Sequence, residues 1–141
     1  MSSVTFITTV YNKSKYLKYV IQSIRNQTGD FKKEFIFIND GSTDNSLEIL
    51  EKETKNLKNC KIITQKNKGS ANATNVGIFL AKNKYIKFLD ADDLITNNAT
   101  ETMVALLEEH LKCVLVYGEQ TKTENFKKVD LKTIINPKNI K

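Results

Sequence analysis

The chain has 141 residues, of which 40% are hydrophobic and 27% are charged, a balance that fits one ordinary soluble globular domain. No apolar run approaches the roughly 20 residues that span a bilayer, and no basic segment precedes an apolar one at the N-terminus, so we expect neither a membrane span nor a secretory signal. The net charge of +6 permits contact with nucleic acid, anionic lipid or phosphorylated small molecules. The lysines are dispersed without the aromatic pattern of an RNA-binding sheet, so we expect no nucleic acid partner and at most weak contact with a membrane surface.

The first half of the chain alternates between strand and helix patterns. Val4–Val10 is an apolar, β-branched run that predicts a buried strand, and apolar side chains at helical spacing over Tyr16–Ile24 predict a helix with Ser14 as its N-cap. Phe35–Ile38 predicts a second strand, and a turn then leads into a predicted helix over about Thr43–Leu57.

The second half continues the alternation. Cys60–Thr64, Tyr85–Leu89 and Cys113–Tyr117 are predicted strands. Helices are predicted over Gly69–Ala81, with Val76, Phe79 and Leu80 on the buried side, and over Thr96–Leu111. Strands that alternate with helices predict an α/β fold with a mostly parallel sheet.

The two cysteines begin two of these predicted strands. Cys60 and Cys113 lie far apart and neither belongs to a CxxC pair, so we expect buried free thiols. Reduced thiols fit a cytoplasmic protein, with the inner face of the membrane as a further location.

Polar segments follow the first four predicted strands, where the carboxyl ends of parallel strands meet at one edge of the sheet. These segments are Thr9–Asn12, Asn39–Asp44, Gln65–Gly69 and Asp90–Asp93. Their convergence predicts a binding site and is more informative than any one of them.

The last segment carries three carboxylates in four residues, Asp90, Asp92 and Asp93. Clustered carboxylates repel one another unless a positive group lies among them, and divalent cations prefer oxygen ligands. A cation here would suit a phosphate-bearing substrate. Capping of the next helix and a solvated loop are the alternatives.

The other segments also have two interpretations each. Asp40 could accept hydrogen bonds from a base or a ribose, or it could belong to a capped turn without a ligand. Tyr11 could stack on a base, or it could pack on the first helix. Small residues beside Gly69 could admit a ligand or only a close helix–sheet contact.

Four motifs give the chain a resemblance to a known family. They are Thr9–Asn12, Asn39–Asp44, Asn67–Gly77 and Phe88–Asp93. In order and spacing they resemble the N-terminal half of a family 2 glycosyltransferase, from residue 4 to about residue 118. The resemblance implies the GT-A fold, a Rossmann-like three-layer sandwich with helices on both faces of the central sheet.

The resemblance also implies an activity, a cofactor and site residues. It implies metal-dependent, inverting transfer of a sugar from a nucleotide-diphosphate-sugar, with UDP as the expected nucleotide, to a glycan or lipid-linked acceptor in polysaccharide or cell-surface glycan synthesis. Asp92 and Asp90 would form the DxD metal site for Mn²⁺ or Mg²⁺. The implied substrate-binding residues are Thr9, Tyr11, Asp40, Asn67, Gly69, Asn75, Asp90 and Ala91.

The chain departs from the family pattern in two places. Thr74 stands where the family usually has arginine, with Lys66 or Lys68 as substitute cations. The catalytic base usually lies farther along than Lys141, and we identify none. We therefore expect a donor-binding domain at 1–118 and, at 119–141, a polar tail or the start of a truncated acceptor-binding region.

Two alternatives and one further expectation follow. The chain could be a truncated or degenerate domain that binds the nucleotide sugar without turnover. A phosphoryl-handling α/β domain is disfavoured, because its key acids follow the first strand, where this chain has Thr-Val-Tyr-Asn. An exposed sheet edge could also support a homodimer.

Overall fold

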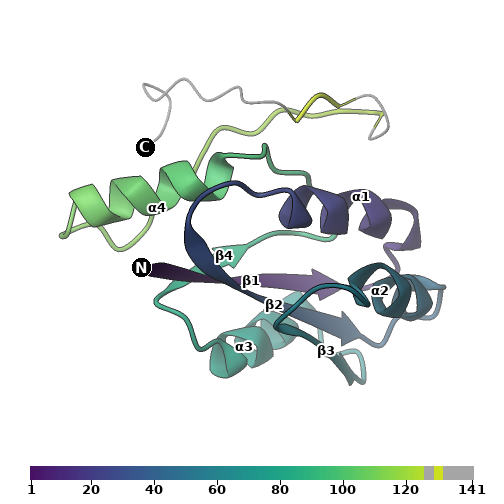
Figure 1. Ribbon diagram of the computed structural model, residues 1–141. Coiled ribbons are helices and arrows are strands. Elements are labelled where there is room, and N and C mark those ends of the chain that lie inside the picture. The colour runs from purple at the N-terminus through teal and green to yellow at the C-terminus, as the bar shows by residue number, and fades with distance from the viewer. Residues whose placement is uncertain (126–128, 132–141) are drawn as a thin grey trace.

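The computed structural model describes residues 1–125 and 129–131 and contains a parallel four-stranded sheet in the order β3-β2-β1-β4 (Figure 1). The elements in chain order are β1 Ser2–Val10, α1 Ser14–Arg25, β2 Phe31–Asp40, α2 Ser46–Thr54, β3 Cys60–Gln65, α3 Ser70–Leu80, β4 Tyr85–Phe88 and α4 Ala99–Glu109. The predicted α/β fold with a parallel sheet is confirmed.

The helices lie on both faces of the sheet, as expected for a three-layer sandwich. Figure 1 shows α1 and α4 above the sheet and α3 below it. The larger core cluster joins α1, with Leu17 and Ile21, to one face of the sheet. On the other face, Ala73 of α3 packs against Ile36 and Ile38 of β2.

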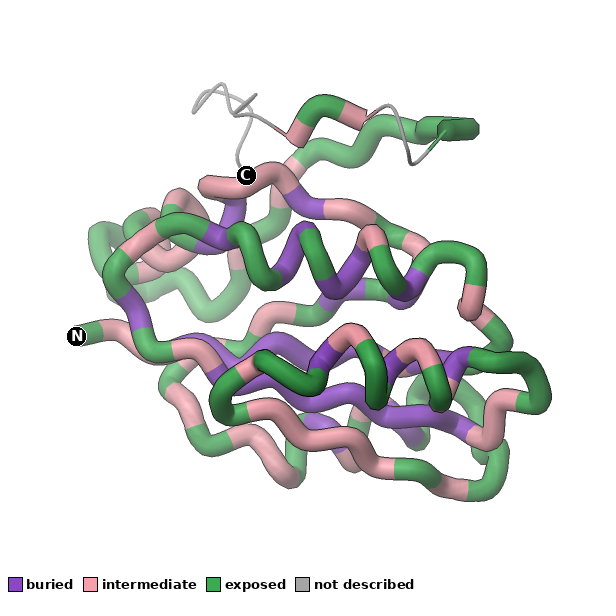
Figure 2. The backbone as a smooth tube through the Cα atoms, turned by 45° about the vertical axis from the view of Figure 1, so that its right-hand side comes forward, coloured by how far each residue is buried: buried purple, intermediate pink, exposed green. Residues whose placement is uncertain are grey.

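The central strands are buried on both faces, which explains their nearly continuous apolar sequences. Figure 2 shows the buried residues gathered along β1, β2 and one side of α1, while much of the remaining backbone is intermediate or exposed. The helix α3 comes very close to β1, since a Cβ added to Gly77 would lie 2.5 Å from Ile7 Cγ2. Glycine at this position therefore allows the helix and the sheet to approach.

The predicted fifth strand over Cys113–Tyr117 is wrong. This segment has no strand geometry, and Val114 is 97% exposed. An apolar run becomes a strand only when a neighbouring strand supplies hydrogen bonds, and in the described part of the chain β4 pairs with β1 alone. Cys60 and Cys113 are free thiols, as predicted, but the prediction that they are buried is wrong, because Cys113 is exposed and Cys60 is half-buried.

Two local predictions need correction as well. Phe79 is 89% exposed, because it follows Gly77 by two residues and so lies about 200° around α3 from the side that faces the sheet. Ser14 is the first residue of α1 rather than its cap, and Lys13 occupies the cap position without a side-chain capping bond.

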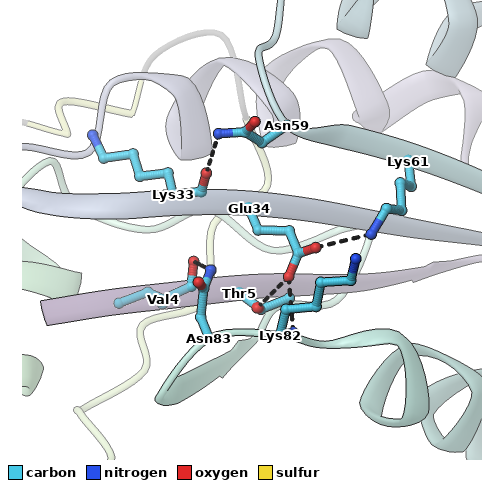
Figure 3. Close-up of polar contacts among 8 residues, drawn as sticks. All are labelled: Val4, Thr5, Lys33, Glu34, Asn59, Lys61, Lys82 and Asn83. Atoms are coloured by element: carbon cyan, nitrogen blue, oxygen red, sulfur yellow. Dashed lines mark hydrogen bonds and ion pairs between the residues drawn. The ribbon is translucent and has the colours of Figure 1, made fainter.

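A buried carboxylate, Glu34, joins three parts of the fold toward the amino ends of the strands (Figure 3). Glu34 Oε2 accepts hydrogen bonds from Thr5 Oγ1 at 2.7 Å and from the Lys82 amide at 3.1 Å, and Oε1 pairs with Lys61 Nζ at 3.0 Å. Burial by itself raises the pKa of Glu34, but these partners outweigh it and hold the pKa below its ordinary value. The network ties β1, β2, β3 and the α3–β4 loop together, away from the polar edge of the sheet.

Candidate functional site

A cavity of about 510 Å³ opens at the carboxyl edge of the sheet. It is lined by residues from the ends of β1 and β2, from the loop before α3 and from the segment after β4. The lining residues are Thr9, Val10, Tyr11, Lys13, Asp40, Asn67, Gly69, Ser70, Asp90, Ala91 and Asp92. The convergence that the sequence predicted is therefore present.

The loops that follow β1 and β2 are hydrogen-bonded to each other. Asn12 Oδ1 accepts bonds from the backbone amides of Thr43 at 2.8 Å and Asp44 at 3.2 Å, and the Asn12 amide donates to Ser42 Oγ at 3.1 Å. Asn12 has a φ of 52°, a left-handed conformation that asparagine tolerates better than most residues. Ser42, Thr43 and Asp44 thus hold the two loops together, and Asp40 is the residue of this motif that lines the cavity.

Asp40 is buried and ties the end of β2 to the loop before α3. Its Oδ1 accepts bonds from Gln65 Nε2 at 2.7 Å and the Lys68 amide at 2.9 Å, and its Oδ2 accepts one from the Gly69 amide at 2.8 Å. Burial raises the pKa of Asp40, but these hydrogen bonds outweigh it and lower the pKa below its ordinary value. Asp40 is therefore an ionised carboxylate at neutral pH, and it holds one wall of the cavity.

The acidic segment after β4 contributes Asp90, Ala91 and Asp92 to the lining of the same cavity. Asp92 Oδ2 lies 2.5 Å from Lys13 Nζ, and the two side chains are 40% and 35% exposed. The hydrogen bond to Asp92 raises the pKa of Lys13. Burial raises the pKa of Asp93, and the negative charges of Asp90 and Asp92 raise it further.

These carboxylates fit a cation shared with a substrate better than one held by the protein alone. Among the residues that the structure describes, no three His, Cys, Asp or Glu side chains are grouped so that they could hold a metal ion. Asp90 and Asp92 nevertheless line one cavity. Mg²⁺ is commonly bound by one or two carboxylates together with substrate phosphates, and carboxylates also suit Mn²⁺, so the donor set fits either ion.

The cavity brings together most of the residues singled out from the sequence, namely Thr9, Tyr11, Asp40, Asn67, Gly69, Asp90, Ala91 and Asp92. Asn75 is exposed on α3 and does not line the cavity. The sequence reasoning missed Lys13, because a lysine shortly after a strand resembles the many dispersed lysines of this chain. Its ion pair crosses 79 positions, which no local pattern reveals.

Comparison with known families decides the identity of the chain. The model of Glycosyl transferase family 2 matches residues 5–140. The chain belongs to glycosyltransferase family 2. Among curated relatives of this family 2 chain, the glycosyltransferase GlyG of Streptococcus pneumoniae is 36% identical over 107 residues, which are 75% of this chain and 35% of GlyG. The minor teichoic acid biosynthesis protein GgaA of Bacillus subtilis is 40% identical over 105 residues, which are 70% of this chain and 23% of GgaA.

Solved structures support the same assignment. The structure of S. aureus TarS 1–349 in complex with UDP-GlcNAc superposes with a TM-score of 0.70 at 30% identity, covering 77% of this chain and 32% of the TarS chain. A mannosyltransferase from Pyrobaculum calidifontis, solved with GDP-Man and Mn²⁺, has a TM-score of 0.65 at 23% identity over 74% of this chain and 32% of its own. The similarity to the mannosyltransferase supports the assignment of the fold, which is GT-A.

The family 2 chain spans only part of its relatives. It covers about a third of GlyG and about a quarter of GgaA. In the described residues, no helix combines the length and the apolar character that crossing a membrane requires.

Proposed function

We propose that the cavity at the carboxyl edge binds a nucleotide-diphosphate-sugar together with a divalent cation, and that the chain supplies the donor site of an inverting sugar transferase. The observation that carries the proposal is the meeting of Tyr11, Asp40, Asp90 and Asp92 around one cavity. Its volume of about 510 Å³ lies within the usual range for small-molecule sites.

The residues that line the cavity have distinct chemical uses. Tyr11 is 47% exposed and presents an aromatic face on which a base can stack, with Thr9 beside it. Asp40 acts on the nucleotide chiefly by holding the Asn67–Gly69 loop, because two of its hydrogen bonds go to the Lys68 and Gly69 amides. A Cβ added to Gly69 would meet no atom within 4 Å, so the backbone there has open space for a ligand.

The acidic residues of the lining suit a diphosphate that is bound through a cation. Asp92, with Asp90, would hold Mn²⁺ or Mg²⁺. When bound, the cation would neutralise negative charge on the leaving nucleoside diphosphate. Ala91 is buried and stands between the two carboxylates in sequence, and the Asp93 amide donates to the Asp90 carbonyl at 3.1 Å, so both carboxylates lie on one tight turn.

The relatives support a narrower choice of donor and pathway. TarS, at 30% identity, was solved with UDP and with UDP-GlcNAc, which favours a UDP-sugar as the donor. GgaA takes part in minor teichoic acid biosynthesis, which favours a cell-surface polymer or lipid-linked glycan as the acceptor. A cytoplasmic location, contact with the inner membrane face and a homodimer stay predictions.

Donor binding without turnover is the second candidate function. The chain spans 35% of GlyG and 32% of TarS 1–349, so turnover, which belongs to the whole protein, is proposed separately from donor binding. Both candidates use the same cavity and differ in whether an acceptor hydroxyl is deprotonated. We assign that step to no residue of the chain.

Calorimetry with UDP or GDP, with and without Mn²⁺, tests the proposal. We expect Mn²⁺-dependent binding of UDP, and we expect Asp90→Asn combined with Asp92→Asn to abolish the Mn²⁺ requirement and most of the affinity. Asp30→Asn, a change at an exposed aspartate outside the cavity, is the matched control. Unchanged nucleotide affinity in the double variant would contradict the proposed site, and an assay of UDP-sugar hydrolysis separates the two candidates.

A further inference from the structure

Lys13 and Asp92 form an ion pair inside the candidate site, with Nζ and Oδ2 2.5 Å apart. We propose that Lys13 is a positioning residue with two partners: it holds Asp92 before the cation binds, and it moves to the diphosphate of the donor once a divalent cation takes Asp92. This inference rests on the proposed donor site and adds to it the basic residue that recognises the diphosphate.

The geometry allows the side chain to move while the backbone stays in place. The Lys13 amide donates to Ser46 Oγ at 2.9 Å, and the Lys13 carbonyl accepts bonds from the amides of Tyr16 and Leu17 at the start of α1. The ammonium lies at the end of a flexible four-carbon stem with three rotatable donors. Both members of the pair are about a third exposed or more, so a ligand in the cavity can reach them.

The distribution of positive charge points to Lys13 rather than to another base. Arg25 is the only arginine of the chain, and its Nη2 donates to the carbonyl of Glu53, away from the cavity lining. Among the described residues that line the cavity, Lys13 is the one basic side chain. Thr74 supplies no charge at the position where the family usually has arginine.

The charge balance requires such a group. Asp90 and Asp92 both line the cavity, and a donor adds the negative charge of its diphosphate. A divalent cation balances the two carboxylates but leaves the diphosphate largely uncompensated. An ammonium that is released from Asp92 at the moment the cation binds offsets part of that remaining charge.

The two roles predict effects of opposite sign when the ammonium is removed. Lys13 competes with a cation for Asp92, so Lys13→Met should bind Mn²⁺ alone more tightly, on the order of threefold for a partly exposed ion pair. The same variant should bind UDP in the presence of Mn²⁺ on the order of tenfold more weakly, because a charge-assisted hydrogen bond is lost. A purely structural role would weaken both.

The experiment titrates Mn²⁺ alone, followed by the electron paramagnetic resonance signal of the free ion, and then UDP at saturating Mn²⁺ by calorimetry. Lys13→Arg keeps the positive charge and should retain UDP binding, while Lys13→Gln repeats the loss of charge with a polar side chain if the methionine variant does not fold. Lys15→Met, at an exposed lysine two residues along that does not line the cavity, is the matched control and should change neither affinity.

Tighter Mn²⁺ binding with weaker UDP binding in Lys13→Met supports the inference. Parallel weakening of both ligands, or UDP affinity equal to that of the wild type, overturns the role of Lys13 and leaves the donor site intact. If the wild-type chain itself binds no UDP with Mn²⁺, the proposed function fails and this inference fails with it.

Discussion

The buried carboxylate of Glu34 gives the sharpest test of how the fold is held together. It accepts hydrogen bonds from the Thr5 hydroxyl and the Lys82 amide and pairs with Lys61 (Figure 3). Glu34→Leu keeps most of the side-chain volume and removes every acceptor. We expect the free energy of unfolding to fall, because buried donors lose their partner.

The magnitude follows from the three donors. Thr5 is fully buried, so its stranded hydroxyl costs about 1–3 kcal/mol. The Lys82 amide is partly buried and adds a smaller cost, while the side chain of Lys61 is 40% exposed and can return to water at little cost. Leucine recovers about 1 kcal/mol through apolar burial and the absence of a desolvated charge, so the net loss is about 2 kcal/mol.

Urea denaturation measures this loss, with Glu51→Gln at an exposed glutamate of α2 as the control. The double change of Thr5→Val and Glu34→Leu should be no less stable than Glu34→Leu alone, because the hydroxyl is then no longer stranded. Unfolding free energies that add up across the two changes, or a Glu34→Leu variant as stable as the wild type, would refute the reasoning.

The same network has a pH dependence of defined sign. The pKa of Glu34 is lowered in the folded chain from its ordinary value of 4.5, so the unfolded chain binds more protons just below that pH. The stability that Glu34 contributes is therefore complete above about pH 4.5 and is lost as the pH falls toward the folded pKa. The difference in unfolding free energy between wild type and Glu34→Leu should shrink over that interval.

Three further predictions concern the cavity wall and the helices. Asp40→Asn turns one acceptor oxygen into a donor beside backbone amides, so the free energy of unfolding should fall by about 1.5–3 kcal/mol, as thermal unfolding would measure. UDP binding should also weaken, as calorimetry would measure. Unchanged values would contradict the proposal that Asp40 holds one wall of the cavity. Gly77→Ala brings a Cβ to 2.5 Å from Ile7 Cγ2 and should lower the free energy of unfolding by about 1 kcal/mol, despite the better helix propensity of alanine. A variant that is more stable in urea than the wild type would contradict the close contact between α3 and β1. Lys84, Tyr85 and Ser2 lower the pKa of Glu108 to about 2, so Glu108 anchors α4 above about pH 4.5 and releases it as the pH falls toward 2. Glu108→Gln should make α4 more sensitive to proteolysis at pH 7 than the control Glu109→Gln. Equal sensitivity of the two variants would argue against the anchor.

The sequence was sufficient for the order of the elements from β1 to α4 and for most of the residues that line the cavity. Local patterns located these elements because their buried residues follow the period of the element. The strands β1 and β2 contain nearly continuous apolar runs, and the buried residues of α1 recur at helical spacing. Parallel strands also place their carboxyl ends at one edge, so the order of the strands was enough to assign the polar residues after each of them to one site. The four family motifs strengthened that assignment.

Local patterns failed where burial depends on a distant partner. The run at Cys113–Tyr117 has the composition of a strand, but strand formation needs a neighbouring edge, and its residues lie largely exposed in the fold. Phe79 shows the same limit on a helix. Its apolar side chain favours burial, but the residue alone does not tell which side of α3 packs against the sheet.

The cavity shows most clearly what the sequence determined and what only the tertiary structure determined. Sequence alone determined that aspartates, an aromatic ring and glycine-containing turns follow the strands of a GT-A fold. Only the tertiary structure decided that Asp40 directs its hydrogen bonds to the loop before α3 and that Lys13 pairs with Asp92. Such pairings depend on distances between residues far apart in the chain, and those distances exist only once the sheet and its helices have packed.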